Sequence, residues 1–384
     1  MAAAGARFAC PRILVCGTHA PQLCLAWEPV RSYPRRADRA AHFGKCAAGG
    51  WGDNVKASAD HHVLVTGGAG FIGSHTVDVL MARGCRVLVV DDLSTGYMAN
   101  LARWRDHPRL TVLKADITDD LAGHLKHATA SMGPLDRIIH FAAQTAVPLS
   151  VDDPANDIRV NLGGTAQVLE YARRNGIAKI VFASSSAVYD DDAPVPVSEA
   201  SLARPASPYG ISKLSGEFYL DYYSRYFGLK FTALRFMNVY GPRQDPKSHY
   251  SGVISIFMDR AVTGAPITIF DDGEQTRDFV FVTDVAQAVV GACLDNRGDG
   301  EIINIGTGLE VSVNLIARTI LELAQSNSPI TYAPARVGDI RRSVTTMDKA
   351  TRSLGFVPQV KLREGLDQTL AWVRAEAVSV SSSV

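Results

Sequence analysis

This 384-residue chain lacks any apolar run long enough to cross a bilayer, so we expect no membrane-spanning segment. It also lacks an excess of one charge, because 39 basic residues balance 39 acidic ones, and no basic stripe suggests a nucleic-acid partner. Cysteine is scarce: the six cysteines are scattered without CxxC spacing, which excludes a disulfide scaffold and predicts no metal site. These absences favour a protein of the reducing cytoplasm.

Residues 1–58 differ from the rest, because alanine, arginine, tryptophan, glycine and cysteine are mixed there without a helical or strand period. We expect a disordered extension, or the product of an upstream start site, that contributes nothing to the fold. The alternative is an organelle targeting peptide, which the arginines and the scarcity of acids suggest but the lack of serine enrichment does not support.

Three glycines, spaced three residues apart, follow a short apolar strand at 63–65 and precede a helical pattern. In such a unit the first glycine makes the tight turn, the second lets a pyrophosphate approach, and the third allows the helix to pack closely on the strand. A second strand, Arg86–Val90, ends in Asp91, where a ribose would offer its hydroxyls and a carboxylate favours NAD over NADP. The pattern predicts a dinucleotide site. Its glycines are Gly67, Gly70 and Gly73.

Strands and helices alternate from residue 62 to about 185, with further strands expected at Leu110–Lys114, Arg137–Phe141 and Lys179–Ala183. This alternation predicts an α/β fold with a doubly wound parallel (Rossmann) sheet, whose ligands bind at the carboxyl ends of the strands. We expect a smaller C-terminal α/β substrate-binding domain as well. The boundaries are 62–235 for the NAD-binding domain, including the helix of Tyr209 and Lys213, mainly 236–374 for the substrate domain, and 375–384 for a frayed tail.

Tyr209 and Lys213 are four residues apart, so on a helix they share one face. An ammonium near a phenol favours the phenolate and lowers the pKa of the tyrosine, which makes it a usable base near neutral pH. With Ser185 at a strand end, the three residues suit hydride chemistry on a hydroxyl. Tyr209 removes the proton, Ser185 hydrogen-bonds the same oxygen, and a nicotinamide accepts the hydride.

Aromatic residues recur on the helix after Lys213. We interpret them as helix core or as a helix-pair interface and not as ligand contacts. They are Phe218, Tyr219, Tyr222, Tyr223 and Tyr226.

At this point the chain resembles the extended short-chain dehydrogenase/reductase family, and within it the UDP-hexose 4-epimerases. The resemblance covers residues 62 to about 374. It is carried by the sequences TGGAGFIG at 66–73, HFAA at 140–143, LRFMNVYG at 234–241, GEQTRDF at 273–279 and RVGDIRRS at 336–343, together with Asp116-Ile117, the serines before Val188-Tyr189 and Tyr-x-x-x-Lys at 209–213.

The resemblance implies a tightly held NAD, a UDP-sugar and epimerisation at carbon 4 through a transient 4-keto sugar. The family's catalytic serine or threonine lies four residues before the tyrosine of its Val-Tyr-Gly motif, which selects Ser185. The implied cofactor contacts are Gly67, Gly70, Phe71, Ile72, Gly73, Asp91, Asp92, Ser94, Thr95, Asp116, Ile117, Phe141, Ala142, Ala143, Asn161, Tyr209, Lys213 and Met237. The implied substrate contacts are Ser185, Ser186, Asn238, Val253, Thr268, Phe270, Arg277, Arg336, Asp339 and Ser343.

Sister activities of the family need an acid near the catalytic residue: its 4,6-dehydratases carry an Asp-Glu pair, and its UDP-glucuronate decarboxylases a glutamate. Here Ser186 and Ala187 follow instead, which favours epimerisation. Ser343 stands where epimerases restricted to UDP-glucose carry a bulky tyrosine, so UDP-GlcNAc and UDP-GalNAc are further candidate substrates. The alternatives are a UDP-glucuronate or UDP-pentose 4-epimerase, a nucleotide-sugar oxidoreductase, and a non-catalytic NAD-binding protein.

Two positions depart from the family's pattern, because Asp190 and Asp271 replace glycines. Glycine serves there for backbone freedom or close approach, so we expect local strain without loss of function. The resemblance also implies a homodimer formed by two helices from each subunit.

Overall fold

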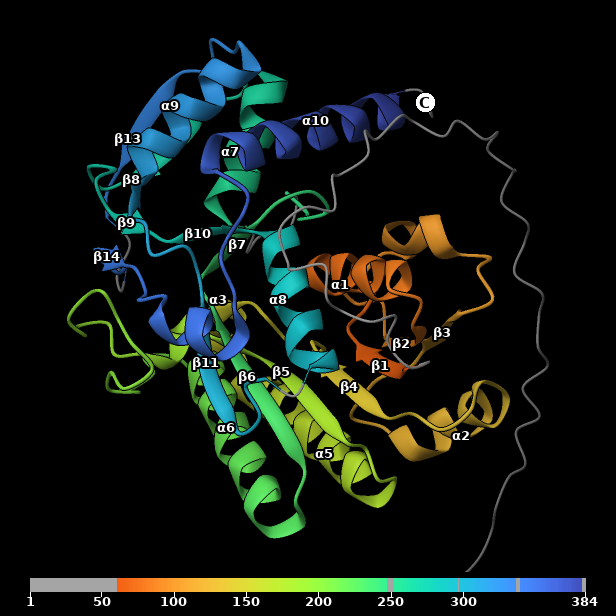
Figure 1. Cartoon of the computed structure of the whole chain (residues 1–384). Helices are drawn as coiled ribbons and strands as arrows, with labels where there is room; N and C mark the ends of the chain where they lie inside the picture. The colour runs from red at the N-terminus through yellow and green to blue at the C-terminus, as the bar shows by residue number, and fades with distance from the viewer. Residues whose placement is uncertain (1–60, 247–251, 296, 336–338, 382–384) are drawn as a thin grey trace, which may run out of the picture. The chain divides into compact units, whose positions relative to one another are not determined.

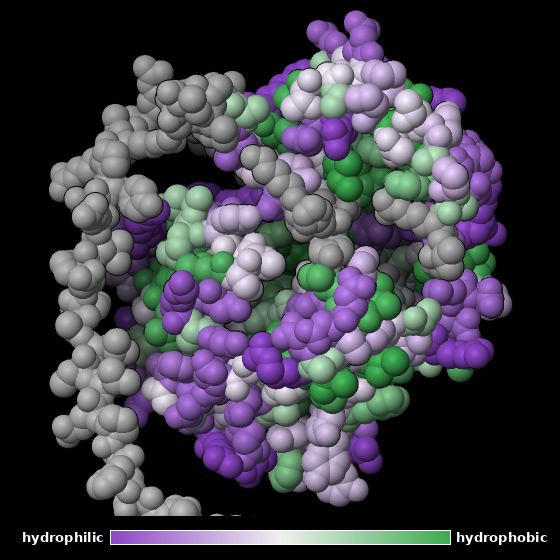
Figure 2. All heavy atoms as spheres, turned by 180° about the vertical axis from the view of Figure 1, so that it is seen from behind, coloured by the Kyte–Doolittle hydropathy of each residue, from purple (hydrophilic) through white to green (hydrophobic). Residues whose placement is uncertain are grey.

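The computed structural model describes residues 61–246, 252–295, 297–335 and 339–381. The expected extension at 1–58 and the predicted substrate contact Arg336 lie outside these residues. No helix in the described part has the length and apolar composition needed to cross a membrane. Figure 2 shows hydrophilic residues spread over the face it displays, with hydrophobic residues between them.

The central element is a parallel sheet of seven strands, with the order β11-β6-β5-β4-β1-β2-β3. From β1 the chain adds β2 and β3 toward one edge of the sheet, and from β4 it adds β5 and β6 toward the other edge. The strand order therefore reverses between the neighbours β1 and β4 (Figure 1). This is the doubly wound Rossmann arrangement, and it confirms the predicted fold class. The strands are β1 (His62–Thr66), β2 (Arg86–Asp91), β3 (Leu110–Lys114), β4 (Arg137–His140), β5 (Lys179–Ser185), β6 (Lys230–Phe236) and β11 (Glu301–Ile305).

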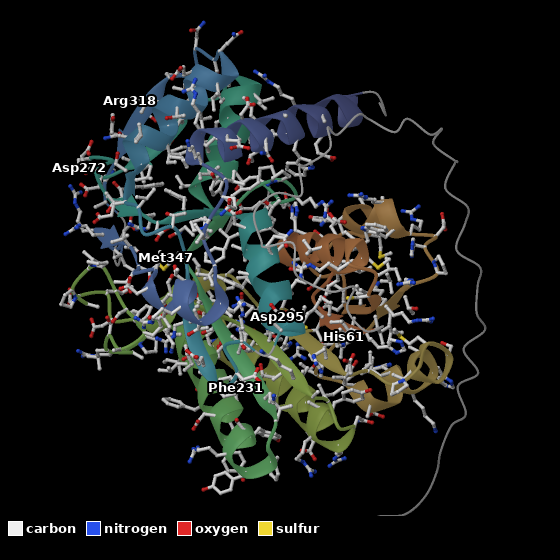
Figure 3. All side chains as sticks on the ribbon, in the orientation of Figure 1. His61, Phe231, Asp272, Asp295, Arg318 and Met347 are labelled. Carbon is white, nitrogen blue, oxygen red and sulfur yellow. The ribbon has the colours of Figure 1, made fainter. Side chains whose placement is uncertain are left out.

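These segments form parallel strands because helices cover both faces of the sheet, so each strand can be apolar at every position. In β2, all of residues 87–91 are buried. The leucines and isoleucines on one face, with Phe231 of β6 (labelled in Figure 3), belong to one core with α2 (Leu121–Met132), α5 (Gly164–Arg174) and α6 (Pro208–Phe227). Two further helices, α1 (Phe71–Ala82) and α8 (Val282–Leu294), pack against each other and against strands of the same sheet.

The C-terminal part builds a second core from short strands and three helices. The pairs are β7 with β10, β8 with β13, and β9 between β12 and β14. The helices are α7 (Val253–Thr263), α9 (Val313–Ala324) and α10 (Leu362–Ser381). The strands are β7 (Asn238–Tyr240), β8 (Ile267–Phe270), β9 (Thr276–Arg277), β10 (Phe279–Phe281), β12 (Val311–Ser312), β13 (Ile330–Ala333) and β14 (Arg342–Ser343).

The chain leaves the large sheet after β6 and later returns to it. Residues after 235 form the second core first, and then α8 and β11 come back, with β11 pairing beside β6. The large sheet therefore takes strands from both sides of the expected boundary at residue 235.

Several short elements are absent from the sequence-based expectation. Residues 147–163 form α3 (Val147–Asp152), α4 (Pro154–Asp157) and the π-helical turn η2 (Ile158–Gly163). Short helical turns also occur at η1 (Met98–Trp104), η3 (Ser186–Val188) and η4 (Ala350–Leu354).

The expected frayed tail is helical over most of its length. Helix α10 continues through residue 381, well past residue 375, where the frayed tail was expected to begin. The run Ala-Glu-Ala at 375–377 explains the extension, since alanine and glutamate are strong helix formers.

The two aspartates that replace the family's glycines behave differently. Asp271 has a left-handed backbone, with φ +60°, so the expected strain falls on this residue. Asp190 is not among the described residues with positive φ, and its carboxylate accepts a hydrogen bond from Asp192 N at 2.9 Å. The expectation of backbone strain is wrong at Asp190.

The loop between β5 and α6 is attached to the segment after β14. Val197 N donates to Val344 O at 2.8 Å, and Thr346 N donates to Val197 O at 2.9 Å. The side chain of Glu199 accepts from Asn304 N at 2.8 Å. The loop that leads from Ser185 to Tyr209 is thus held by residues more than 100 positions away in sequence.

Candidate active site

The predicted site residues gather at the carboxyl ends of the parallel strands, which share one edge of the sheet. They fall into groups: Gly67 to Gly73 after β1, Asp91 to Thr95 at β2, Asp116 and Ile117 after β3, Phe141 to Ala143 after β4, Ser185 and Ser186 at β5, and Met237 and Asn238 after β6. Phe71 and Ile72 open helix α1, whose amino end therefore points into this edge.

The glycine turn has the geometry that its sequence predicts. Gly67 has φ +70°, a left-handed conformation that glycine adopts without strain. A Cβ at Gly73 would stand 2.1 Å from Gly67 O, so only glycine lets α1 approach the turn this closely. Gly70 N donates to Gly67 O at 3.2 Å, which closes the turn. Because its glycines have no side chains, the turn lets a diphosphate approach the backbone closely.

Asp91 ends β2 beside this turn and is buried. Its carboxylate accepts hydrogen bonds from Ala69 N and Leu93 N, each at 2.9 Å. Burial raises the pKa of Asp91, although these hydrogen bonds act in the opposite direction. The exposed neighbour Asp92 accepts from the backbone and hydroxyl of Ser94 at 2.9 and 2.7 Å. The close-packed glycine turn and the adjacent carboxylate together fit NAD.

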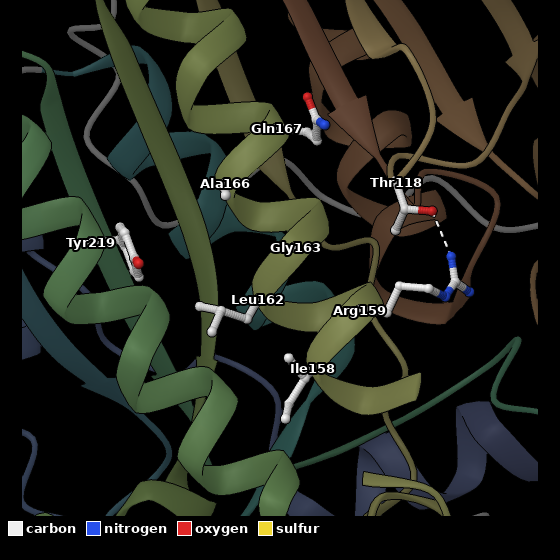
Figure 4. Close-up of a pocket in the computed structure, with 8 residues that line it drawn as sticks. All are labelled: Thr118, Ile158, Arg159, Leu162, Gly163, Ala166, Gln167 and Tyr219. Carbon is white, nitrogen blue, oxygen red and sulfur yellow. Dashed lines mark hydrogen bonds between the residues drawn. The ribbon is translucent and has the colours of Figure 1, made fainter. Parts of the chain in front are cut away.

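The end of β3 contributes a second carboxylate. Burial would raise the pKa of Asp116, but hydrogen bonds from Thr118 and Arg159 hold it below its ordinary value. Arg159 lies 3.4 Å from Asp116 and donates to Thr118 Oγ1 at 2.6 Å, the contact drawn in Figure 4.

Asn161 supports the loop after β4. Its Oδ1 accepts from Gln144 N at 2.7 Å, and its Nδ2 donates to Gln144 O at 2.9 Å and to Asp157 Oδ1 at 2.8 Å. The side chain of this predicted cofactor contact is therefore engaged with the protein itself. It orders the loop that follows Ala142 and Ala143.

His140 is the last residue of β4 and is buried between two hydroxyls. Its Nδ1 lies 2.7 Å from Thr66 Oγ1, and its Nε2 lies 3.1 Å from Thr165 Oγ1. Burial lowers the pKa of His140 to about 3, and the charge of Lys213 contributes. The imidazole is neutral near pH 7 and joins β1, β4 and α5 beneath the site.

Helix α6 begins with Ser207, whose hydroxyl accepts from Gly210 N at 3.1 Å, and Pro208 at its first position. This start places Tyr209 in the first turn and Lys213 in the next, on one face of the helix. Tyr209 N donates to Ser150 Oγ of α3 at 3.1 Å, which fixes the helix start.

Ser185 and Tyr209 lie close together, and a hydrogen bond between their side chains lowers the pKa of the tyrosine. The Ser185 hydroxyl also accepts from Ala187 N at 3.1 Å. Lys213 Nζ donates to Ala183 O on β5 at 2.9 Å and lies 5.7 Å from the Tyr209 ring centre. The predicted trio thus occupies one place between α6 and the end of β5.

The pKa of Tyr209 differs from the expectation. Burial raises it to about 12, and the carboxylate of Asp157 adds to the rise. Burial lowers the pKa of Lys213 to about 8, with Asp157 acting in the opposite direction. The sequence interpretation considered the lysine charge alone, whereas burial is the largest influence on both groups.

Three residues of the predicted substrate group meet at β9 and β14. Arg277 donates to Asp339, to Ile340 O at 2.6 Å and to Thr276 O at 2.8 Å. Ser343 is the register partner of Arg277 in the parallel pair β14–β9. These contacts fix the orientation of the Arg277 guanidinium beside β14, and a guanidinium held in this way can offer paired N–H donors to a diphosphate.

The remaining predicted substrate contacts are more scattered. Asn238 is exposed on β7, and Val253 opens α7. The predicted cofactor contact Met237, just before Asn238, is buried. Thr268 is exposed on β8, and its hydroxyl lies 3.3 Å from that of Thr331 on β13. Phe270 ends the same strand and is half-buried.

Three charged residues of the site were missed by the sequence interpretation. Asp157, Glu217 and Arg235 are buried, and each contacts an element that carries the trio. Asp157 Oδ2 accepts from Ser212 Oγ at 2.7 Å, directly beside Lys213. Glu217 could have been found, because it repeats the four-residue spacing of Tyr209 and Lys213 and so lies on the same face of the helix.

Comparison with known proteins adds a consistent set of relatives. A family model described as the NAD dependent epimerase/dehydratase family matches residues 63–306. A UDP-glucose 4-epimerase of Mycolicibacterium smegmatis is 42% identical over 313 residues, which cover 81% of this chain and 98% of the relative.

Two solved structures are similar throughout the same region. A UDP-glucose 4-epimerase of Thermotoga maritima with UDP-glucose has a TM-score of 0.77 and 40% identity, covering 82% of this chain and 99% of that one. A UDP-N-acetylglucosamine 4-epimerase of Methanobrevibacter ruminantium, in complex with UDP-N-acetylmuramic acid, has a TM-score of 0.77 and 34% identity, covering 83% and 99%.

Proposed function

Because the chain belongs to the NAD-dependent epimerase/dehydratase family, we propose that it is a UDP-hexose 4-epimerase acting on UDP-glucose and UDP-galactose. The observation that carries this proposal is the trio of Ser185, Tyr209 and Lys213, held between β5 and α6. The similarity to epimerases at 40% and 42% identity supports the reaction class.

The trio can perform the proton transfers of this reaction. Tyr209 takes the proton of the carbon-4 hydroxyl while Ser185 hydrogen-bonds the same oxygen, and both residues reverse these roles when the hydroxyl forms again. Lys213, held by Ala183 O, supplies the positive charge that favours the phenolate. Bound NAD supplies a group that accepts a hydride and returns it.

The nucleotide contacts remain part of the proposal. The glycine turn, Asp91, Asp116 and the residues grouped after each strand hold the cofactor. Arg277, Asn238 and Asp339 hold the UDP moiety, while the sugar is held loosely enough to turn and present its other face. Tight nucleotide binding with loose sugar binding is what epimerisation without net oxidation requires.

The residues after Ser185 argue against the sister reactions. Water loss or decarboxylation needs an added acid close to the reacting carbons, and Ser186 and Ala187 offer none. The buried carboxylates near the trio are already engaged. Asp157 accepts a hydrogen bond from Ser212, and Glu217 accepts from Ser184 and Arg235.

Ser343 leaves room for a larger sugar. A serine on β14 beside Arg277 is small and half-buried, so an N-acetyl group at carbon 2 can be accommodated where a tyrosine would fill the space. The similarity to an epimerase named for UDP-N-acetylglucosamine supports this second substrate pair. Failure to turn over UDP-GlcNAc would contradict it.

The deciding experiment is incubation of the protein, without added NAD, with UDP-glucose, UDP-GlcNAc, UDP-glucuronate and UDP-xylose, with NMR identification of the products. We expect UDP-galactose from UDP-glucose and no accumulation of reduced cofactor. Net reduction of NAD would instead identify an oxidoreductase, and conversion of UDP-glucuronate or UDP-xylose alone would identify a different 4-epimerase.

Tyr209→Phe provides the matched test of mechanism. Loss of the hydroxyl removes the base and should lower kcat by about 10² to 10⁴-fold, the usual worth of general acid–base catalysis. The amount of NAD that remains bound to the purified protein should not change, because the ring still fills its buried place. Full residual epimerisation would overturn the assignment of Tyr209.

We also propose a homodimer formed through α5 and α6. The aromatic residues of α6 were interpreted as helix core or as a helix-pair interface, and their exposure favours the interface: Phe218 and Tyr226 are 66% and 65% exposed, while Tyr223 is half-buried against the core. A pocket of about 340 Å³ opens on the same face between η2, α5 and α6 (Figure 4). Light scattering should report twice the chain mass; a monomer at micromolar concentration would refute this assembly.

A further inference from the structure

A buried ion pair lies directly behind the catalytic strand. Arg235 Nε donates to Glu217 Oε1 at 2.9 Å and Arg235 Nη2 donates to Oε2 at 2.6 Å, with the two side chains 5% and 1% exposed. Removing two charges from water is costly, and apolar residues of similar size often serve a core equally well. Stability alone is therefore a weak reason for this pair.

The ion pair is attached to both elements that carry the trio. Glu217 follows Lys213 by one helical turn and Tyr209 by two, so all three lie on the face of α6 that meets β5. On β5, Ser184 is the register partner of Arg235, and its hydroxyl donates to Glu217 Oε1 at 2.5 Å. Ser184 immediately precedes the catalytic serine.

Helix α6 thus contacts β5 at two successive residues. Lys213 Nζ binds Ala183 O at 2.9 Å, and Glu217 binds the Ser184 hydroxyl one turn further along the helix. The next residue of the strand is Ser185, whose hydroxyl must meet that of Tyr209. The spacing of these contacts sets how far the serine lies from the tyrosine.

Further buried contacts link the ion pair to the residues near Ser343, the proposed sugar contact. The Arg235 guanidinium lies 4.8 Å from the ring centre of Tyr189, whose hydroxyl donates to Asn304 Oδ1 at 2.6 Å. Asn304 Nδ2 donates to Thr345 Oγ1 at 2.7 Å, two residues beyond Ser343. A contiguous buried polar network therefore runs from α6 to the segment that follows β14, the strand of the proposed sugar contact.

We propose that Glu217 and Arg235 are positioning residues for the epimerisation: through Ser184 their ion pair fixes Ser185 of β5 against Tyr209 and Lys213 of α6. The inference rests on the proposed function. Loosening the pair leaves the glycine turn and Arg277 in place, so binding of NAD and of the UDP moiety is retained. The geometry of proton transfer is lost, and kcat falls while KM does not rise.

Ser184→Ala is the mildest test, because it deletes one hydrogen bond to Glu217 and leaves no buried charge without its partner. We expect kcat for UDP-glucose to fall about fivefold to tenfold, with KM within twofold of the parent and with the parent's content of bound NAD. Ser184→Thr keeps a hydroxyl, suits a strand and should restore most of kcat.

Thr369→Ala is the matched control. It removes a buried hydroxyl from α10, where Thr369 Oγ1 donates to Gly365 O at 2.7 Å, away from the trio. Both alanine variants should lower the melting temperature by a similar amount, whereas only Ser184→Ala should lower kcat. An equal kcat in the two variants, or a rise in KM that accounts for the whole loss, would overturn the positioning role.

The parent protein separates this inference from the proposed function. If the parent converts UDP-glucose and Ser184→Ala converts it equally fast, the positioning role is wrong and the epimerase assignment stands. If the parent converts none of the UDP-sugars while it holds NAD, the proposed function itself is wrong.

Discussion

Tyr209 is subject to opposing influences on its ionisation. Its pKa is raised to about 12, mainly by burial and in part by the charge of Asp157, while a hydrogen bond to Ser185 acts in the other direction. Lys213, with a pKa lowered to about 8, still carries its charge at neutral pH. Asp157 stabilises that ammonium, so one carboxylate has opposite effects on catalysis: it keeps the lysine charged and makes the tyrosine a poorer base.

Replacing Asp157 with asparagine should reveal this balance in the pH dependence of kcat/KM. Loss of the negative charge lowers the pKa of Tyr209 and that of Lys213, so both limbs of the profile should move to lower pH, by about one unit. The amide can still accept from Ser212. Asp152→Asn removes an exposed charge on α3 and should leave the pH profile unchanged. If the pKa of the acid limb stays the same or rises in Asp157→Asn, this account is wrong.

The trio could be predicted from the sequence because each member follows a local rule: two residues four apart on a helix, and a serine at a strand end. Its electrostatics could not, since burial comes from packing of elements distant in sequence. Asp157 comes from α4 and Arg235 from β6, and neither has a local pattern that points to Tyr209. The raised pKa of the tyrosine is therefore a tertiary property.

The glycine turn between β1 and α1 gives a sharp prediction for an element. Gly73→Ala would place a Cβ 2.1 Å from Gly67 O, so α1 must shift away from the turn. We expect a loss of about 2 kcal/mol or more in the free energy of unfolding and loss of bound NAD in the purified protein. Urea unfolding and the absorbance of released cofactor measure the two effects.

Gly163→Ala is the matched substitution. A Cβ there would stand 3.7 Å from Ile158 O, an ordinary contact, and alanine favours a helix over glycine. NAD content should be unchanged and stability equal or slightly higher. If both alanine variants keep their NAD, close packing at Gly73 is not what holds the diphosphate site.

Strands inside the sheet could be predicted because burial on both faces produces continuous apolar runs such as 87–90. Elements formed by distant pairing could not. The three-residue strands β7 and β10 exist because they pair with each other, and the turns at 147–163 carry no regular period. Asp190 and Asp271 make the same point, since an identical substitution for glycine meets a left-handed backbone at one position only.

The whole molecule should lose stability in mild acid because two of its histidines are buried and neutral. Burial lowers the pKa of His140 to about 3 and that of His75 to about 4, from 6.5. The unfolded chain binds protons below pH 6.5 that the folded chain does not bind until pH 3 to 4, so their contribution is complete above 6.5 and is lost on acidification. At pH 5 the loss is about 2 kcal/mol for each histidine.

Urea unfolding at pH 7.5 and at pH 5 measures this loss, and His140→Asn should reduce the difference between the two free energies by about 2 kcal/mol. His124→Asn, at an exposed position of α2, should leave the difference as in the parent. A parent and a His140→Asn variant that lose the same free energy on acidification would show that another group is responsible.

The backbone hydrogen bonds of Val197 with Val344 and Thr346 constrain how these segments can be exchanged in engineered chimeras or in evolution. The segment around Ser343 cannot be exchanged between relatives as an independent specificity cassette, because it forms a bridge with the loop that joins Ser185 to Tyr209. A chimera that takes only residues 340–346 from a relative should disturb the hydrogen bonds to Val197 and slow the reaction with every sugar. Substrate preference and catalytic competence should therefore be inherited together, with residues 190–205 exchanged as part of the same unit.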